Sequence, residues 1–284
     1  MQFWTEELNN KLEELKKTSK KLKVIIHPPI ADIFFNDRLI GTSPQTIYIN
    51  TEKRRNTISV AAPAYLEEHR VLTQTDYEKG TVKILLVKAP SSDEEVTTDI
   101  RVHGWMSNRR KDPRNPVLMR AVAQYFSRYA KQLEDKSEEK EWYLLQAKEE
   151  LDELLDVAPG WYMAHNQVGV YYAKVNHDLA LKHYHVATAL NPDNYLGYFN
   201  QACAFARKGD EDKSYYDKVL EVLNIFLENP KILESYSYSN MRLKKEEAFD
   251  GLKAKRKRAN TFYALVRQIN KAAKKIKKRR KKHL

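Results

Sequence analysis

Nine cations within the last fourteen residues are the side chains of this sequence with the clearest chemical potential. They are Lys271, Lys274, Lys275, Lys277, Lys278, Arg279, Arg280, Lys281 and Lys282. No acidic residue follows Asp250, and fifteen basic residues lie from Lys253 to the end. Subtracting these fifteen from the net charge of +12 leaves −3 for the rest of the chain. This asymmetry favours a polyanion partner, such as nucleic acid, over a helix end that only carries solvated charge.

The remaining reactive side chains do not form a catalytic or metal-binding set. His183 and His185 are two residues apart on an expected helix, so they point to different faces and do not chelate one ion. The single cysteine, Cys203, lies between two alanines and is expected to pack as a small hydrophobe. No phosphate-binding glycine loop, HExxH helix or nucleophile elbow is present. The sequence therefore predicts a protein that is not an enzyme and holds no cofactor and no metal.

The composition indicates a cytoplasmic protein of two domains or more. The chain has 284 residues, and one domain typically takes about 150. Its start has neither a basic region nor an apolar core, so we expect no signal peptide. The longest uncharged stretch, 157–173, contains proline, glycine and amide side chains, so no transmembrane segment is predicted.

The N-terminal third changes from helical to strand periodicity. Residues 2–22 place Trp4 and four leucines on one face of an amphipathic helix. Short β-branched or aromatic runs with turn residues between them then predict a small antiparallel sandwich over 23–88. The expected strands are 23–26, 32–35, 46–49, 57–61, 68–73 and 81–87. Residues 89–115 are expected to be a linker, because they are rich in proline, serine and charge.

The predicted β region resembles a PEGA domain. The matching residues are Val24–Ile26, Pro29, Ala31–Phe35, Asn36–Arg38, Gly41–Pro44 and Ala64-Tyr65. Ala64 departs from the pattern, because the family has glycine before this aromatic residue. The resemblance implies a non-catalytic β module. PEGA domains are frequently extracytoplasmic, which disagrees with the expected absence of a signal peptide.

From Val117 onward a helical repeat is visible. Ala147, Leu151, Leu154 and Pro159 have spacings of 4, 3 and 5, and Ala180, Tyr184, Ala187 and Pro192 repeat them. Small residues let paired helices approach closely, and proline ends the second helix of each pair. Helix pairs are expected at 117–134 with 138–157, 161–174 with 177–190, and 194–208 with 211–228. The third pair departs from the pattern at Lys218 and Glu221.

This pattern resembles a tetratricopeptide (TPR) repeat array. The resemblance implies a concave groove for a protein partner, lined by the first helix of each pair. The groove candidates are Met163, Asn166, Val170, Ala173, Leu196, Phe199, Asn200 and Arg207, with Cys203 beside them. Phe262, Leu265, Val266, Ile269, Ala273 and Ile276 form an apolar stripe that suits a capping helix.

The expected fold is therefore α+β multidomain: a small antiparallel β-sandwich, then an α-helical TPR solenoid with a basic C-terminal helix. The expected domains are 1–22, an amphipathic helix; 23–88, the PEGA-like sandwich; 89–115, a linker; 116–228, the repeats; and 229–284, a capping helix with a polybasic tail. The predicted function is a scaffold or adaptor that binds a protein partner in the groove and a polyanion through the tail. Two alternatives stay open: a nucleic-acid- or ribosome-associated protein whose tail is the main site, and a regulatory subunit of an enzyme.

Overall fold

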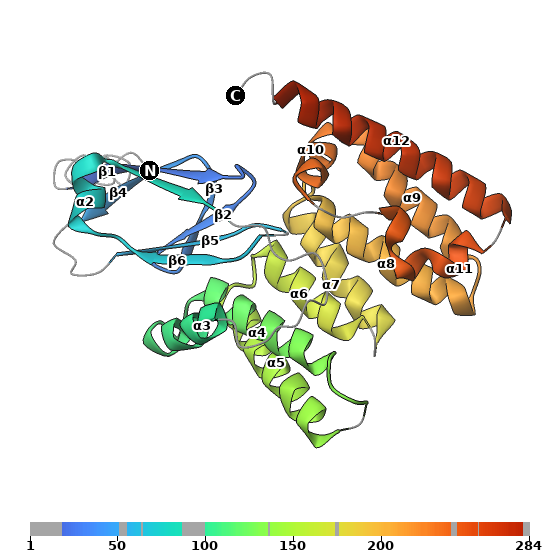
Figure 1. Ribbon diagram of the computed structural model, residues 1–284, viewed down its shortest axis with the longest axis horizontal. Coiled ribbons are helices and arrows are strands. Elements are labelled where there is room, and N and C mark those ends of the chain that lie inside the picture. The colour runs from blue at the N-terminus through green and yellow to red at the C-terminus, as the bar shows by residue number, and fades with distance from the viewer. Residues whose placement is uncertain are drawn as a thin grey trace, which may run out of the picture. The chain divides into compact units, whose positions relative to one another are not determined.

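The computed structural model divides the chain into two compact units, Met1–Pro90 and Ser91–Leu284 (Figure 1). It describes residues 19–50, 56–63, 65–86, 100–135, 137–173, 176–239, 243–254 and 256–280. We call the first the β unit and the second the helical unit, and each is described by itself.

The β unit contains two sheets that share one hydrophobic core. Its elements are β1 (Ser19–His27), β2 (Asp32–Phe35), β3 (Arg38–Thr42), β4 (Gln45–Asn50), β5 (Thr57–Ala61), β6 (Glu68–Val71), α2 (Gln74–Lys79) and β7 (Thr81–Leu85). The strand orders are β4-β1-β7 and β3-β2-β5-β6. Leu22, Val24 and Ile26 of β1 are buried in the core, whereas Lys21 and Lys23, on either side of Leu22, are exposed. Alternation with a period of two therefore turns one face of the strand inward.

Local turn chemistry shapes the second sheet. Asn36 and Asp37 have φ angles of 45° and 66°, the left-handed backbone of a two-residue hairpin that Asn and Asp tolerate. This turn joins β2 to β3. Thr73 and Asp76 form a capping box at the start of α2, which ends at Gly80 with a φ of 61°. Neither β3 nor α2 was expected from the sequence.

Three expectations for the first 115 residues need correction. The predicted helix over 2–22 lies mostly outside the described residues, but its last four residues belong to β1, where Leu22 pairs with Ile47. The predicted antiparallel arrangement is only partly present, because β7 runs parallel to β1. The spacing of apolar residues in the sequence predicts where strands lie, but it does not give the direction in which each strand runs in the sheet. The predicted linker over 89–115 contains a helix, α3 (Ile100–Lys111).

The helical unit contains three antiparallel helix pairs that end close to the expected positions. They are α4 (Pro116–Ala130) with α5 (Glu138–Val157), α6 (Tyr162–Tyr172) with α7 (His177–Leu190), and α8 (Tyr195–Glu211) with α9 (Tyr215–Glu228). Side chains of Asn115, Asn176 and Asn194 accept hydrogen bonds from the first backbone N–H groups of α4, α7 and α8. These caps satisfy donors that a helix start leaves unpaired.

The second helix of each pair buries the same spacing of residues. The nine positions, each 2% exposed or less, are Ala147, Leu151, Leu154, Ala180, Tyr184, Ala187, Val219, Leu223 and Phe226. In the third pair this stripe begins at Val219, and Lys218 and Glu221, where the expected register requires apolar and small residues, are exposed, so that register was wrong. Helix α8 has 17 residues where α6 has 11, and this extra length moves the next stripe along the sequence.

The C-terminal part is not one continuous helix. It contains α10 (Pro230–Tyr238), two 3-10 turns (Leu243–Lys245 and Glu247–Phe249), α11 (Asp250–Lys253) and α12 (Arg256–Arg280). Helix α12 packs on α9 and α10. Five residues of the predicted apolar stripe are buried in the core of the helical unit, namely Phe262, Leu265, Val266, Ile269 and Ala273. The sixth, Ile276, is partly buried against it.

Candidate functional site

The predicted groove residues on α6 and α8 are mostly in the core. On α6, Met163, Asn166 and Ala173 are buried, and Val170 is 38% exposed. On α8, Phe199, Asn200 and Cys203 are buried. The Asn200 amide donates to Asn166 Oδ1 at 3.2 Å, so the two asparagines link α6 to α8.

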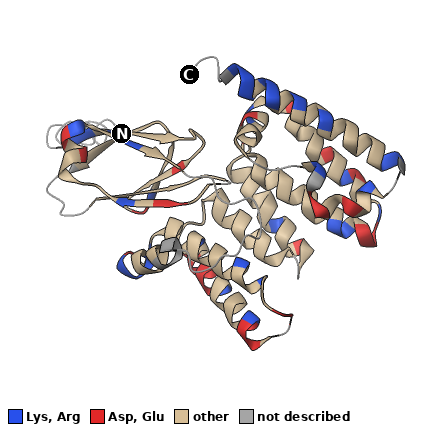
Figure 2. Ribbon diagram, viewed as in Figure 1, with Lys and Arg blue, Asp and Glu red and all other residues tan. Residues whose placement is uncertain are grey.

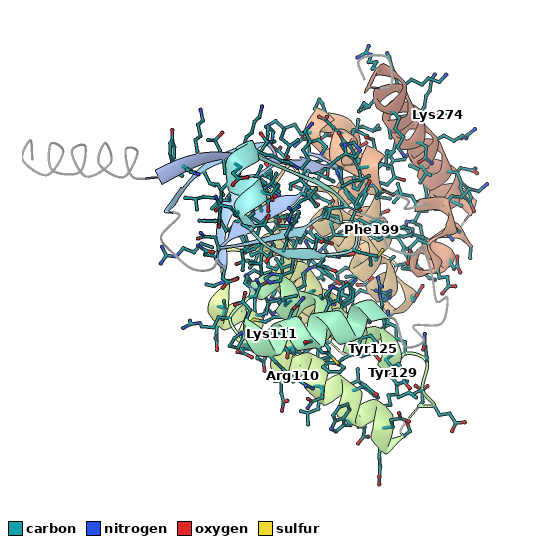
Figure 3. The ribbon with its side chains drawn as sticks, turned by 60° about the vertical axis from the view of Figure 1, so that its left-hand side comes forward. Arg110, Lys111, Tyr125, Tyr129, Phe199 and Lys274 are labelled. Atoms are coloured by element: carbon teal, nitrogen blue, oxygen red, sulfur yellow. The ribbon has the colours of Figure 1, made fainter. Side chains whose placement is uncertain are left out.

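The segment from Leu243 to Lys253 packs on α8 at these positions. The ring of Phe249 lies 6.4 Å from Phe199 and 5.2 Å from Phe262, centroid to centroid. Figure 3 shows Phe199 among the packed side chains of the helical unit. Of the eight groove candidates, Val170 is exposed and two others, Leu196 and Arg207, are partly buried. The structure therefore does not bring the eight together on one open surface. No local sequence pattern indicated this packing, because it depends on a segment that folds back from more than 40 residues away.

The basic residues form an exposed face on α12. Arg267, Lys271, Lys274, Lys275 and Lys278 point away from the buried stripe and are all exposed. Figure 2 shows cations along α12, and Figure 3 shows Lys274 on its outer side. Lys277 and Arg279 are exposed on the same helix. The side chain of Arg280 and residues Lys281 and Lys282 lie outside the described residues. The described cations therefore belong to a helix packed on the repeats, whereas the sequence suggested that they extend past a cap.

The cations of α12 differ in whether they have a partner. At the start of the helix, Arg258 forms a two-pronged ion pair with Asp217 of α9, at 2.8 and 2.9 Å. This pair lowers the pKa of Asp217, mainly through the hydrogen bonds from the guanidinium. Among the residues that the structure describes, Lys271, Lys274, Lys275 and Lys278 have no carboxylate partner. We call these four lysines with Arg267 the basic face.

The histidines make a contact that the sequence did not suggest. His183 Nδ1 lies 3.2 Å from Nδ1 of His165, and His165 Nε2 lies 2.9 Å from the Pro159 carbonyl. A carbonyl only accepts, so neutral His165 donates there and His183 donates to His165. Burial, and then the neighbouring His165, lower the pKa of His183. His185 is exposed and takes no part.

The described residues contain no arrangement for metal chemistry. Among them, no three or more histidine, cysteine, aspartate or glutamate side chains are placed so that they could hold one metal ion. Burial raises the pKa of the Cys203 thiol, which keeps it protonated and unreactive. Within the same residues, no helix is long and apolar enough to cross a membrane.

The packing inside the second pair accounts for its glycine. A Cβ at Gly169 would lie 2.3 Å from the ring of Tyr184, so only glycine lets α6 and α7 approach this closely. Ala180 and Ala187 flank Tyr184 on the same buried stripe. Small residues, an aromatic beside them and three stacked antiparallel pairs are together typical of one architecture. The helical unit is a stack of antiparallel helix pairs, as in α-helical repeat proteins.

Solved TPR proteins are similar to this chain at low identity. TTC0263, a thermophilic TPR protein of Thermus thermophilus, is 17% identical over 58% of this chain and 71% of its own, with a TM-score of 0.40. A crystal structure of MamA is 15% identical over 61% and 89%, with a TM-score of 0.36. No family model matches the chain, and no curated protein matches it. The assignment of the repeat therefore rests on its own helix pairs.

Proposed function

We propose that the chain is a non-catalytic adaptor whose helical unit binds a protein partner and whose basic face binds a polyanion. The observation that carries the proposal is that the two sides of α12 differ. One side of this helix closes the core of the repeats, and the opposite side presents cations without carboxylate partners. A packed helix holds these cations in a fixed row, so binding does not require the row to be ordered first.

The spacing of the basic face suits a nucleic-acid backbone. From Arg267 to Lys278 the helix rises about 16 Å, at about 1.5 Å per residue. One strand of a duplex presents about five phosphates over that length. An anionic membrane fits less well, because Phe262, Ile269 and Ala273 are buried in the protein and are not available for insertion.

The test replaces charge and leaves the packing intact. Deleting residues 271–284 would also remove buried Ala273, so we choose Lys271→Gln, Lys274→Gln, Lys275→Gln and Lys278→Gln together. A variant with Lys20, Lys21, Lys23 and Lys83 changed to Gln is the control, because these exposed lysines of the β unit give the same loss of net charge.

Affinity for duplex DNA, single-stranded RNA and anionic vesicles is measured between low and physiological salt. We expect the α12 variant to lose affinity for nucleic acid and to reduce the log–log salt slope on duplex DNA by about 3 to 4. The control is expected to change neither quantity by as much. Equal losses in both variants would show that net charge, and not this face, attracts the polyanion.

We further propose that the β unit is a PEGA-like sandwich that contributes no chemistry. Support comes from its Gly-Thr-Ser-Pro step, where the Ser43 hydroxyl accepts from Ile26 N at 2.7 Å and donates to Ile26 O at 3.2 Å. A fragment beginning at Ser91 is expected to keep both binding activities. Loss of either one would assign a binding role to the β unit. The cytoplasmic location stays a prediction.

The nucleic-acid- or ribosome-associated alternative places the main site on α12 and predicts that no protein partner is retained after nuclease treatment. The alternative of a regulatory enzyme subunit predicts co-purification with an activity. A pull-down with and without nuclease separates both from the adaptor.

A further inference from the structure

Helix α5 carries an exposed apolar pair on its outer face. Trp142 and Leu145, three residues apart, are each 52% exposed. The other exposed large apolar side chains described in the helical unit, Val170, Val186 and Leu190, are between 38% and 42% exposed. The buried stripe of α5 runs through Ala147, Leu151 and Leu154, so the pair does not belong to the core.

The indole of Trp142 is held in place although half of its surface is open. Its ring meets Tyr143 at 4.9 Å and an interplanar angle of 85°, and Phe126 at 6.1 Å and 77°. Tyr143 in turn contacts Tyr129 of α4 at 4.5 Å. Figure 3 labels Tyr129 and its neighbour Tyr125 on this side of the unit. A fixed, half-exposed tryptophan resembles the anchors that dominate protein interfaces, because little freedom is lost when it is covered.

Carboxylates surround this apolar pair. Glu138 lies one helical turn before Trp142, and Glu141 and Glu149 lie one turn before and after Leu145. All three are exposed. Glu149 accepts a hydrogen bond from Gln146, and no ion pair joins any of the three to a described residue. The arrangement is an apolar centre with an anionic rim, which is the anatomy of a protein-binding patch.

We propose that this α5 patch, defined as Trp142, Leu145, Glu138, Glu141 and Glu149, binds a basic peptide segment of the protein partner. The inference rests on the proposed adaptor function and moves its partner site to α5, away from the buried groove residues. An apolar side chain of the segment covers the pair, and its lysines or arginines meet the three carboxylates. An arginine also stacks favourably on an exposed indole. The same rim repels nucleic acid and anionic lipid, so these are not the occupants.

The probe is a fluorescent amphipathic peptide built from leucine, lysine and arginine. A second peptide, with glutamate in place of every cation, tests the sign of the charge. The full-length protein is titrated with each, and we expect the basic peptide to bind and the acidic one not to bind.

Two kinds of variant locate the site. Trp142→Ala with Leu145→Ser is expected to lower the affinity for the basic peptide about tenfold or more, because loss of an interface anchor has an effect of this size. The matched control is Val186→Ser with Leu190→Ser, a pair of exposed apolar residues on α7 without an acidic rim, and it should bind as the wild type does. Leu145→Glu alone keeps the Trp142 packing, so its weaker binding cannot come from misfolding of the aromatic cluster. Glu138→Gln, Glu141→Gln and Glu149→Gln together should weaken binding and flatten its salt dependence.

Several results would overturn the inference. One is equal peptide binding by the wild type and the Trp142 variant, and another is equal weakening in the α7 control. A third is the absence of peptide binding by the wild type. Self-association that depends on Trp142 would make a second copy the occupant and would equally reject a foreign segment. A native partner captured equally by the wild type and the α5 variants would reject this site and leave the adaptor function standing. The nucleic-acid titration of α12 is independent of all these results.

Discussion

Helices α5 and α12 are both amphipathic, but their outer faces carry opposite charge and are organised differently. Helix α5 has eight acidic and two basic residues, and α12 has eleven basic and no acidic residues. On α5, Glu150 and Glu153 both pair with Arg109 of α3, at 3.0 and 2.5 Å, and Lys148 pairs with Asp152. On α12, Arg258 forms an ion pair with Asp217 of α9. The charges of α5 are thus partly structural, whereas the four lysines of the basic face have no carboxylate partner among the described residues.

The largest effect is expected from the buried side of α12. Phe262 is fully buried and contacts Phe249, so Phe262→Ala should reduce the free energy of unfolding by about 3–5 kcal/mol. The four glutamine substitutions on the opposite side should stay within about 0.5 kcal/mol. Urea unfolding of both variants measures the contrast. A similar small loss in both would mean that α12 does not close the repeat core.

A smaller effect is expected from the ion-pair network of α5. Arg109→Leu leaves Glu150, whose side chain is 20% exposed, without its cation. We expect the free energy of unfolding to fall by about 1–3 kcal/mol, the cost of leaving a charged group unpaired. Lys148→Leu, at an exposed pair on the same helix, is the control and should cost less than about 1 kcal/mol. Equal losses would contradict a structural role for Arg109.

The smallest effects concern pH, and the two helices should show opposite signs. Burial raises the pKa of Glu150 above 4.5, and Arg109 only partly offsets it. Its contribution to stability is therefore full below pH 4.5 and is lost as pH rises through the folded pKa. The pKa of Asp217, which faces α12, is lowered by Arg258 below 3.8. Its contribution is present above pH 3.8 and is lost as pH falls through the folded pKa.

Melting temperatures at several pH values test these signs. The melting temperature of Glu150→Gln, relative to that of the wild type, should be higher at pH 7 than at pH 4. The melting temperature of Asp217→Asn, relative to that of the wild type, should be lower at pH 7 than at pH 3. If the melting temperature of a variant and that of the wild type change by the same amount across this pH range, the pKa direction assigned to that residue is rejected.

The helix pairs could be predicted because their signal is local. Ala180, Tyr184 and Ala187 define a buried stripe within two turns, and asparagine caps mark where helices begin. The register of the third helix pair was wrong because it assumed helices of constant length. The greater length of α8 could not be predicted from the spacing of apolar residues in α9. The burial of most groove candidates could not be predicted, because Phe249 reaches Phe199 only through long-range folding. The α5 patch had a usable signal: Trp142 and Leu145 fall among glutamates, off the stripe of Ala147 and Leu151.

The pairing of β1 with β7 has a mechanical consequence. These strands are the first and last among the described residues of the β unit and run parallel, with Lys23 beside Thr81 and His27 beside Leu85. The chain therefore enters the pair at one end and leaves it at the other. A pull along the chain would load the row of hydrogen bonds between β1 and β7 in shear. These hydrogen bonds would then share the force and break together. Lys23 N to Gly80 O, at 3.0 Å, and Leu86 N to His27 O, at 2.9 Å, close the two ends of this row. We therefore expect the β unit to resist a pull applied along the chain more strongly than a pair of strands that opens one hydrogen bond at a time.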